Sequence, residues 1–547
     1  MQIYKDKCFF DPVDIITAFD NAGVVDAFVK IEKYKAQNKY LLGYVRYETK
    51  DVFLGKEITS EFPLVYFEVF DSYNNFEPYL PQNRVNIYSE SEISYEKYIF
   101  AFEKIKSHIA NGNTYEVNYT YPFNVYTAAE SINLYNHLIQ KQKTEYNCFI
   151  SNKYEHLLSF SPELFFKLEG SKILTKPMKG TMPRGSIQAE DDNNRAFLVS
   201  DEKNKAENVM IVDLLRNDLS KIAKTGSVKV DKLFEIESHP TVFQMTSEIS
   251  AELQDNTTLY DIFNALFPCG SITGAPKRST IDIIDELEYF RRDIYCGAIG
   301  FISPDECVFS VPIRILQKKC TDNFYRYFTG GAIVWDSDVF EEWNETQVKK
   351  KIVDTDLEYK LVETMLVEDG EVNLFDYHKI RIMDSADKLG FNFHPKDFVF
   401  DTSKNCIVRF LLSKDGETEV EYLDIYPTRS NKIKISKFCI SKDNMFLGHK
   451  TTFRPWYKRP LKDLFDVIFT NEKGELVEGT RSNIVLKLDG ELYTPPISAG
   501  LLNGTYRQYL IDTNKIKERI LFVEDLKIAE KIYCINSVRR MVEVELV

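Results

Sequence analysis

The sequence predicts an α/β protein built from two domains. It has 547 residues, which exceeds the size of one ordinary domain. Helix and strand patterns are mixed up to residue 353, and an acidic cluster at 354–358 follows them. The remainder contains apolar runs and Gly/Pro turns of its own, enough for an independent core. We therefore place one domain at 1–353 and a second at 357–547.

The order of elements follows from the spacing of apolar residues. In the first domain this spacing predicts helices at 95–110 and 206–222, the latter with Val209 and Leu215 on its buried face. The runs "HLLSFSPELFFKLEG" and "VFSVPIRILQ" predict strands, and Pro312 indicates an edge or a bulge. For the second domain the sequence predicts a strand, a turn at "EDGEVN", a helix at "FDYHKIRIMDSADKLGF", and further strand and helix units.

Composition limits the classes of function. The net charge of -14 argues against a general binder of nucleic acid or of anionic membranes. No apolar run is long enough to span a bilayer, and the charged N-terminal stretch lacks the apolar run of a signal peptide. The nine cysteines form no CxxC pair, which favours reduced thiols over disulfides or zinc. We expect a cytoplasmic protein.

The stretch "TKPMKGTMPRG" places Lys179 between two prolines and two glycines. A lysine in such a turn is usually solvated surface. Alternatively, the prolines stiffen the loop and the glycines permit unusual backbone angles, so that one amine is aimed at a substrate. These residues alone leave both interpretations open.

Carboxylates and glycines elsewhere indicate a small acidic ligand bound with a cation. "EEWNET" places Glu342 and Glu345 on one face of a helix, and Glu207 lies at the start of another helix. They form either a solvated acidic face or a Mg²⁺ site with positions left for water and substrate. "CGSITGAPK", around Ser271, has the composition of an anion cradle before a helix, and "FTGGAIVWDSD" predicts a second glycine turn at 330–331.

The order of these motifs resembles that of the chorismate-utilising enzymes, which include anthranilate synthase component I, aminodeoxychorismate synthase component I, and the isochorismate and salicylate synthases. The resemblance covers roughly residues 90 to 353. It implies a large chorismate-binding α/β sandwich with a central substrate site and Mg²⁺ at the ring carboxylate. The motifs are "SPELF", "PMKGTMPRG", "AENVMIVDLLRNDL", "GSITGAPK", "YCGAIGF", "IRIL" and "DSDVFEEWNET".

Carried over by motif, the resemblance implies that Glu207 and Glu345 bind Mg²⁺ directly, with Glu342 in support. Glu163 would be the general acid that helps expel the C4 hydroxyl of chorismate. Lys179 would attack C2, as in the aminodeoxychorismate branch, whereas anthranilate synthases typically have alanine there. Burial near Mg²⁺ is expected to deprotonate enough of this amine for attack. Lys179 therefore favours a 4-amino over a 2-amino product.

The same resemblance implies that Arg314 and Tyr295 bind the carboxylate of the enolpyruvyl side chain. Ser271 and Gly331 would contribute hydrogen bonds around the ligand. A carboxylate at position 116 leaves open how the nucleophile is activated. The departures from the family pattern are Glu116, where relatives often have glutamine or lysine, Gln244, where several have histidine, and Ala332, which replaces a third glycine.

In the second domain, Lys450 of "HKTTFRPW" and Glu478 of "LVEGTRSNIVL" supply an amine and an acid with small polar groups nearby, as pyridoxal phosphate requires. The lysine alone also fits an ordinary surface residue. Motifs across 357–547, however, resemble class IV aminotransferases and their relative aminodeoxychorismate lyase, which implies a two-subdomain fold like that of D-amino acid aminotransferase. The motifs are "YHKIRIMDSADKLGF", "LGHKTT", "FTNEKGELVEGTRSNIVL", "YTPPISAGLLNGTYRQYLI" and "CINSVRR".

This second resemblance implies that Lys450 forms the covalent link to the cofactor, that Glu478 pairs with its pyridine nitrogen, and that Arg381 binds its phosphate. Tyr506 stands where relatives often have threonine. The rest of the phosphate site would come from Thr505, Tyr506, Asn536 and Ser537.

Together the two resemblances imply a fused two-step enzyme of folate-precursor synthesis. The first domain would convert chorismate and ammonia to 4-amino-4-deoxychorismate, and the second would eliminate pyruvate to give 4-aminobenzoate. The sequence shows no glutamine amidotransferase motif, so a separate glutaminase subunit is expected to supply ammonia. A homodimer through the second domain is a further expectation from class IV relatives.

Three alternatives stay open at this point. One is anthranilate synthase activity beside a fused transaminase. Another is transamination of an ordinary amino acid by the second domain, because class IV motifs establish the cofactor better than the reaction. The third is a non-catalytic scaffold that binds chorismate or pyridoxal phosphate.

Overall fold

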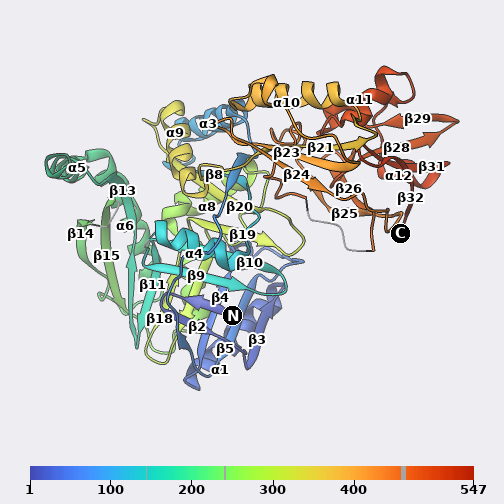
Figure 1. Cartoon of the computed structure of the whole chain (residues 1–547). Coiled ribbons are helices and arrows are strands. Elements are labelled where there is room, and N and C mark those ends of the chain that lie inside the picture. The colour runs from blue at the N-terminus through green and yellow to red at the C-terminus, as the bar shows by residue number, and fades with distance from the viewer. Residues whose placement is uncertain (143, 186, 239–241, 458–462) are drawn as a thin grey trace. The chain divides into compact units, whose positions relative to one another are not determined.

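The computed structural model describes residues 1–142, 144–185, 187–238, 242–457 and 463–547 (Figure 1). The chain divides into two compact units, with the main division between Thr355 and Asp356. Unit 1 comprises Met1–Val125, Ala129–Cys320 and Phe324–Thr355, and unit 2 comprises Tyr126–Ala128, Thr321–Asn323 and Asp356–Val547.

Unit 1 is built on two large antiparallel sheets, A and B. Sheet A has the order β16 (Gly274–Ala275), β8 (Glu116–Tyr126), β20 (Tyr325–Ile333), β19 (Ile315–Lys319), β10 (Glu155–Ser161), β9 (Tyr146–Ser151), β1 (Gln2–Tyr4), β2 (Lys7–Phe9), β6 (Asn74–Asn75), with β7 (Tyr88–Ser91) beside β8. Sheet B has the order β13 (Met178–Pro183), β15 (Val242–Glu252), β12 (Lys172–Lys176), β11 (Leu164–Glu169), β18 (Cys307–Ser310), β17 (Ala298–Ile302), β4 (Tyr40–Val45), β5 (Val65–Phe70), β3 (Asp14–Ala18), with β14 (Lys229–Ser238) beside β15.

The main core of unit 1 joins the two sheets. Ile150 and Leu157 of sheet A belong to the same buried apolar cluster as Phe166 and Ile299 of sheet B. Burial of this much apolar surface is the principal stabilising contribution to such a layered fold. The predicted α/β sandwich is therefore confirmed.

Two proline-containing links, 162–163 and 311–314, connect the sheets. The first joins β10 of sheet A to β11 of sheet B, and the second joins β18 of sheet B to β19 of sheet A. Proline has no N–H to donate to a strand ladder, so Pro162 and Pro312 lie where strands end. The run "VFSVPIRILQ" forms strands as predicted, but they belong to different sheets, and Pro312 lies in the link between them rather than at an edge or a bulge.

The links hold two candidate site residues close together. The backbone oxygen of Glu163, in the first link, accepts a hydrogen bond from Val311 N–H (3.1 Å) in the second. The backbone oxygen of Arg314, in the second link, accepts one from Phe160 N–H (3.2 Å). Arg314 has a φ of 55°, in the left-handed region that non-glycine residues seldom adopt.

Helices cover both sheets of unit 1. The predicted helix at 95–110 is confirmed as α3. The second predicted helix begins earlier, at Glu202, because Asp201 caps it by accepting from the N–H groups of Lys203 and Asn204. Val209 is 40% exposed, against prediction, whereas Leu215 is buried. The helices are α1 (Asn21–Ala36), α2 (Lys50–Phe53), α3 (Tyr95–Ala110), α4 (Ser131–Lys141), α5 (Gln188–Ser200), α6 (Glu202–Ser220), α7 (Leu259–Leu266), α8 (Lys277–Leu287) and α9 (Val339–Lys350).

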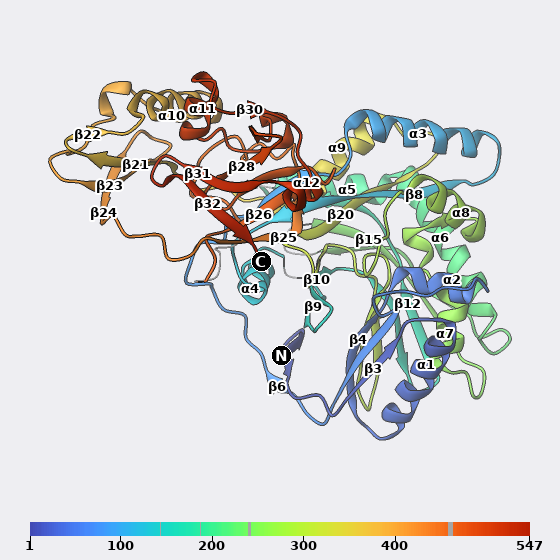
Figure 2. The same ribbon diagram turned by 90° about the vertical axis from the view of Figure 1, so that its right-hand side faces the viewer.

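Two helix pairs of unit 1 pack side by side. Figure 2 shows α1 beside α7 next to β3 and β4, and α3 beside α9 next to β8 and β20. Short 3-10 turns complete the connections. They are η1 (Tyr47–Thr49), η2 (Gly270–Ile272) and η3 (Lys351–Val353) in unit 1, and η4 (Pro395–Asp397) and η5 (Ile497–Ala499) in unit 2.

Unit 2 has two subdomains, as the fold prediction requires. In the first, the predicted strand, turn and helix are confirmed: Asp369 and Gly370 form the turn with positive φ, and α10 (Phe375–Leu389) lies along the sheet (Figure 1). This sheet has the order β22 (Glu371–Val372), β21 (Leu361–Glu368), β23 (Cys406–Leu412), β24 (Thr418–Leu423).

The second subdomain of unit 2 is a small barrel. An extra pairing between β27 and β28 closes the sheet on itself, so these strands leave no free edge between them. Helices α11 (Thr505–Asp512) and α12 (Val523–Ile528) pack against it. Its strand order is β27 (Leu476–Gly479), β26 (Asp466–Asn471), β25 (Lys432–Ile440), β32 (Arg540–Leu546), β31 (Lys531–Asn536), β28 (Asn483–Leu488), β29 (Glu491–Thr494), β30 (Lys517–Glu518).

Candidate functional site

Lys179 lies in β13 at the edge of sheet B, in a strand rather than a surface loop. Its side chain is only 10% exposed, and its Nζ lies 2.6 Å from Glu116 Oε1 of β8. Gln244 of β15 fixes the strand: its Nε2 donates to Gly180 O (2.7 Å), and its Oε1 accepts from Thr181 Oγ1 (2.8 Å). Gly180 has a φ of 77°, which glycine adopts without strain. The surface interpretation of this lysine is therefore wrong.

The electrostatic surroundings of Lys179 are dominated by carboxylates. Burial opposes its charge, but Glu116, Glu207 and Glu163 outweigh that effect and raise the pKa of Lys179 above its ordinary value. The effect of burial alone, expected from the sequence to favour the neutral amine, is therefore outweighed. Glu116 was not predicted as a direct partner of Lys179, although the unusual carboxylate at this position was an available signal.

Glu163 lies at the junction of the two sheets, with its side chain 3% exposed. Ser271 Oγ donates to Glu163 Oε1 (2.6 Å), and the Ser271 hydroxyl also lies 3.1 Å from Cys269 Sγ. Burial raises the pKa of Glu163 to about 7, opposed by the Ser271 hydrogen bond and the charge of Lys179. A carboxyl group that is half protonated at neutral pH can act as a general acid.

The three predicted metal ligands come from two helices. Burial raises the pKa of Glu207 of α6 to about 7, with the Glu342 carboxylate among the causes, so the two side chains interact. Ser337 Oγ donates to Glu342 Oε1 (2.7 Å). Glu345 is 53% exposed and pairs with Lys349 (2.6 Å). The structure thus brings carboxylates of α6 and α9 into one neighbourhood.

The predicted glycine turn at 330–331 is wrong, because Gly330 and Gly331 lie inside β20. They permit close approach instead. A Cβ atom on Gly330 would lie 2.3 Å from Tyr119 O of β8, and one on Gly331 would lie 2.9 Å from Glu342 Oε2. Gly331 therefore keeps space open beside the α9 carboxylates.

Tyr295 and Arg314 lie in adjacent segments. Tyr295 is 5% exposed, and its ring stacks on Phe328 with centroids 5.0 Å apart. Cys296 N–H donates to Pro312 O (3.4 Å), which joins this segment to the link that contains Arg314. In the described part of the chain, the Arg314 guanidinium has no ion-pair partner, so it remains able to bind an anion.

A buried pair supports this site, and the sequence analysis missed it. Arg292 donates twice to Glu288 (2.8 and 2.7 Å), to Ile272 O (2.9 Å) beside Ser271, and to Asn118 O (2.9 Å) on β8. It therefore fixes the Ser271 loop against β8. In the charged run "DELEYFRRD" nothing distinguishes this pair from solvated residues.

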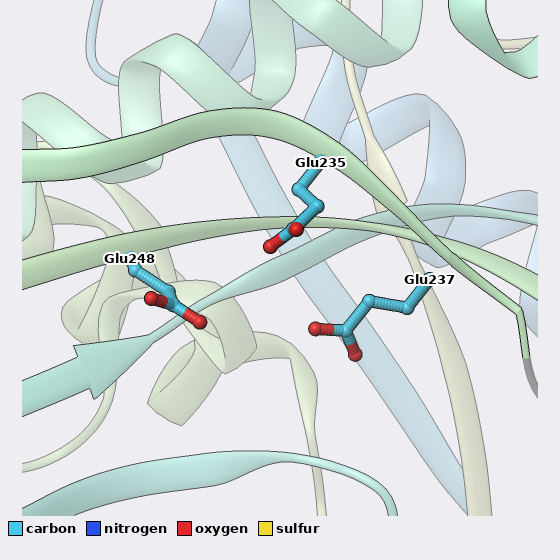
Figure 3. Close-up of side chains that lie close together, drawn as sticks. All are labelled: Glu235, Glu237 and Glu248. Carbon is cyan, nitrogen blue, oxygen red and sulfur yellow. The ribbon is translucent and has the colours of Figure 1, made fainter.

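A separate acidic cluster lies on β14 and β15. Among the residues that the structure describes, Glu235, Glu237 and Glu248 are the group whose carboxylate oxygens lie within 4.8 Å of one another (Figure 3). Lys176 pairs with Glu237 and Glu248, and Lys232 pairs with Glu235 (2.9 Å) and Glu248 (3.3 Å). Two lysines of the same chain therefore offset most of its charge.

In unit 2, Lys450 lies in the segment between β25 and β26 and beside β21, where Val362 N–H donates to its backbone oxygen (2.8 Å). Among the described residues, no side chain hydrogen-bonds to its amine. Burial and the positive charges of Arg381 and Arg454 lower the pKa of Lys450 to about 7, against the opposing effect of Glu363. Much of this amine is therefore neutral near neutral pH, as a lysine that condenses with an aldehyde must be.

Glu478 lies on β27 and is 3% exposed. Its Oε1 accepts from Tyr457 Oη (2.7 Å) and Arg454 Nη2 (3.3 Å), and its Oε2 accepts from Asn483 Nδ2 (3.0 Å). Burial raises the pKa of Glu478 to about 7, opposed by Arg454 and Tyr457. This carboxyl is fixed in position and able to exchange a proton.

Arg381 belongs to a buried network. Its guanidinium donates to both oxygens of Glu363 (2.9 and 2.6 Å) and to Asn503 O (3.4 Å). His378 Nδ1 lies 2.5 Å from Glu363 Oε2, and its Nε2 lies 3.3 Å from Thr505 Oγ1. Glu363 and His378 were missed, although an acid inside the apolar strand "KLVETMLV" and the histidine before Arg381 were available signals.

The remaining predicted cofactor residues surround this network. Thr505 and Tyr506 begin α11, where no side chain caps the first N–H groups, so these donors suit a phosphate. Ser537 Oγ donates to Thr364 O (3.1 Å), next to Glu363. Asn536 Oδ1 accepts from its own turn, at Val538 and Arg539, so this side chain shapes the turn.

Comparison with known proteins decides the family of unit 1. Residues 77–353 match the family described as chorismate binding enzyme. The chain belongs to this family. Residues 420–547 match amino-transferase class IV, so the chorismate binding domain is joined to a class IV aminotransferase domain.

Relatives of the chorismate binding domain include both kinds of aminating synthase. The chain is 37% identical over 258 residues to aminodeoxychorismate synthase component 1 of Escherichia coli, covering 47% of this chain and 56% of that protein. It is 34% identical over 275 residues to an anthranilate synthase component 1 of Haloarcula marismortui, covering 50% and 54%. The chain spans about half the length of these curated relatives.

A solved structure supports the fold. The crystal structure of anthranilate synthase component I from Streptococcus pneumoniae aligns with a TM-score of 0.56 and 23% identity, covering 64% of this chain and 92% of that chain. At this identity the likeness extends to the fold alone. Within the described residues, no helix is long and apolar enough to cross a membrane.

The residues present fit the cofactors typical of these two families. For Mg²⁺, burial and the proximity of other carboxylates raise the pKa values of Glu207 and Glu342. A bound cation would offset this cost of ionising the two carboxyl groups. For pyridoxal phosphate, three features match its aldehyde, ring nitrogen and phosphate. They are the Lys450 amine, which has no hydrogen-bond partner among the described residues, the buried acid Glu478 and the uncapped start of α11.

Proposed function

We propose that the chain makes 4-aminobenzoate from chorismate in two steps. Unit 1 replaces the C4 hydroxyl of chorismate with an amino group to form 4-amino-4-deoxychorismate, and unit 2 eliminates pyruvate from that product. The observation that supports this most strongly is Lys179. Its amine is held in a strand, nearly buried, and close enough to Glu163 for each charge to affect the other.

The first step needs a nucleophile at C2 and an acid at C4, so that electrons can move through the conjugated diene of the ring as the hydroxyl group leaves. The Lys179 amine would form a bond to C2 while the bond from C4 to oxygen breaks, and Glu163 would protonate the departing hydroxide to water. Ammonia would then add at C4 as the Lys179 nitrogen leaves C2. Arg314 and Tyr295 would bind the enolpyruvyl carboxylate, and Ser271 would hold Glu163 in position.

Mg²⁺ would be held by Glu207 and Glu345, with Glu342 in support, and would neutralise the ring carboxylate of the substrate. Gly331 would leave space for this carboxylate beside α9. These assignments rest on the convergence of the α6 and α9 carboxylates.

Pyridoxal phosphate would supply unit 2 with an electron sink for the carbon that carries the amino group. Lys450 would then move the proton at that carbon, Glu478 would hold a proton at the ring nitrogen, and Arg381 with the start of α11 would bind the phosphate. Loss of pyruvate makes the ring aromatic, which favours elimination over return to substrate.

Ammonia would come from a separate glutamine amidotransferase subunit. The relatives named component 1 support this proposal, because that name belongs to one part of a synthase with several components. Free ammonium salts would replace that subunit in the test tube.

The proposal is tested by identifying products. The purified chain is mixed with chorismate, Mg²⁺, ammonium chloride and pyridoxal phosphate, and the mixture is separated by liquid chromatography with mass detection. We expect 4-aminobenzoate and pyruvate in equal amounts. Accumulated 4-amino-4-deoxychorismate would refute the lyase assignment, and anthranilate would refute the assignment of unit 1.

A further inference from the structure

Glu116 is a buried carboxylate to which the two-step scheme gives no role. Its exposed fraction is 0%, and its Oε1 accepts a hydrogen bond from Lys179 Nζ at 2.6 Å. Its Oε2 is also buried and has no hydrogen-bond partner among the described residues. A buried carboxylate oxygen without a hydrogen-bond partner is energetically costly.

The position of Glu116 is fixed by its backbone. As the first residue of β8, it pairs with Ala275 of β16, in the loop that also contains Ser271. Thr114 Oγ1 donates to Glu116 O (2.9 Å), and a Cβ on Gly274 would lie 2.0 Å from the same oxygen. The carboxylate therefore approaches Lys179 from a rigid strand.

Charged groups of four elements act on the Lys179 amine. They are Glu116 of β8, Glu163 of the link between the sheets, Glu207 of α6 and Glu345 of α9, and the last two are assigned to the metal. Only Glu116 is in hydrogen-bond contact with the amine among the described residues. Glu163 already serves as the acid at C4, and Glu207 is assigned to the metal, so Glu116 is the group placed to exchange a proton with Lys179.

We propose that Glu116 is the proton acceptor that frees the Lys179 amine for attack, an inference that rests on the proposed function of unit 1. In the resting site the pair is an ammonium ion and a carboxylate. Transfer of one proton over the 2.6 Å contact leaves a neutral amine and a neutral acid. Exclusion of water by the substrate favours this neutral pair, because a low dielectric penalises separated charges.

The proton balance closes over the whole cycle. The neutral amine bonds to C2, the bond from C4 to oxygen breaks, and Glu163 gives its proton to the hydroxide. Ammonia then bonds to C4, the bond from C2 to the Lys179 nitrogen breaks, and the new ammonium group returns a proton to Glu163. The released Lys179 amine takes back its proton from Glu116. The products are 4-amino-4-deoxychorismate and water, and all three side chains return to their starting states.

The contact is tested first without turnover. Lys179 in the full chain, with Mg²⁺ removed by chelation, is labelled with acetic anhydride at a series of pH values, and its acetylation is measured by mass spectrometry. Wild type should titrate above the ordinary lysine value of 10.5. In Glu116→Gln the pKa of Lys179 should fall, because the anionic partner is gone while burial stays. An unchanged pKa would overturn the inference.

The catalytic role is tested by the pH dependence of kcat/KM for chorismate with ammonium as nitrogen donor. At pH 7, Glu116→Gln should lower kcat/KM by roughly 10²-fold, because the amine must now lose its proton to solvent. The deficit relative to wild type should shrink as pH rises. Glutamine can still accept the Lys179 hydrogen bond, so a wild-type rate and profile in this variant would show that the contact only positions the amine, and would overturn the proposal.

Thr114→Val is the matched control, because it removes a hydrogen bond to the Glu116 backbone and leaves the carboxylate. It should keep the wild-type shape of the pH profile. A pH-dependent deficit in Thr114→Val equal to that of Glu116→Gln would overturn the acid–base role. Absence of both 4-amino-4-deoxychorismate and 4-aminobenzoate from the wild-type reaction would instead refute the function of unit 1. The two failures can be told apart because the labelling result does not depend on turnover.

Discussion

The two lysines to which we assign covalent chemistry sit in opposite electrostatic surroundings. Lys179 of unit 1 is surrounded by Glu116, Glu207 and Glu163, and these carboxylates raise its pKa above the ordinary value despite burial. Lys450 of unit 2 is buried near Arg381 and Arg454, and its pKa falls to about 7. The same side chain is therefore held protonated in one unit and largely neutral in the other.

The difference shows how each site would prepare its amine. Lys450 is ready to condense with an aldehyde at neutral pH, because desolvation and nearby cations have already removed much of its charge. In our proposal Lys179 first loses a proton to Glu116, so its reactivity would depend on substrate binding. A lysine that is neutral only when substrate fills the site is protected from unwanted reactions with other electrophiles.

Replacement of either lysine should have the largest effect on the reactions of the two units. Lys450→Ala should lower 4-aminobenzoate release by roughly three orders of magnitude or more while chorismate is still consumed, so that 4-amino-4-deoxychorismate accumulates. Lys179→Ala should stop chorismate consumption but leave turnover of added 4-amino-4-deoxychorismate. Chromatography of both reactions checks this, and a Lys450→Ala chain that releases 4-aminobenzoate at the wild-type rate would contradict it.

Removal of the acid opposite Lys179 should have the next largest effect. Glu163→Gln should lower kcat for chorismate by roughly 10²–10⁴-fold. In wild type, kcat/KM should decline as pH rises through about 7, because the pKa of Glu163 is about 7 and only its protonated form can supply the proton. This decline should be absent from the variant. Rate measurements between pH 5 and pH 9 test the claim, and a decline that persists in Glu163→Gln would assign it to another group.

A smaller change should follow from loss of the hydroxyl that contacts Glu163. The Ser271 hydrogen bond favours the ionised carboxylate and so lowers the pKa of Glu163. Ser271→Ala should therefore raise that pKa and move the alkaline decline of kcat/KM to higher pH. A shift to lower pH would contradict the assigned direction. Elimination of pyruvate by unit 2 should be unchanged and serves as an internal control.

The smallest effect on the pKa of Lys450 is expected from Arg409, the weakest of the charged groups that act on this amine. Arg409 contributes to lowering the pKa of Lys450, but it is 37% exposed and pairs with Glu421 (2.9 Å). Solvent screens such a charge. Arg409→Gln should raise the pKa of Lys450 slightly, as measured by amine labelling of the cofactor-free chain. A fall in that pKa would contradict the account, and Lys179 in the same sample should titrate as in wild type.

Sequence alone predicts much of this fold because local signals agree with the tertiary structure. The helix at 95–110 has a Ser94 cap and a clear apolar face, and it forms with those bounds. Strands form in the run "VFSVPIRILQ" as predicted, but its pattern cannot show that the chain changes sheets around Pro312. The glycines at 330–331 suggest a turn in the sequence. In the structure they lie inside a strand, where neighbouring atoms leave no room for a side chain.

The candidate site residues also fall into two groups, those that the sequence shows and those that only the structure shows. Motifs select Lys179, Glu163 and Lys450, since unusual spacing of prolines, glycines and acids is visible in sequence. Partners that act across long separations are not visible: Glu116 lies 63 residues from Lys179. The charge around each lysine depends on such partners, so the opposite pKa shifts could be found only from the structure.

Site-resolved acetylation of both lysines in one sample tests the central claim most directly. The full chain is freed of Mg²⁺ and pyridoxal phosphate, labelled with acetic anhydride across the pH range, and digested for mass spectrometry. The account predicts that Lys450 titrates at about 7 and Lys179 above 10.5. Equal pKa values for the two amines, or the reverse order, would contradict it.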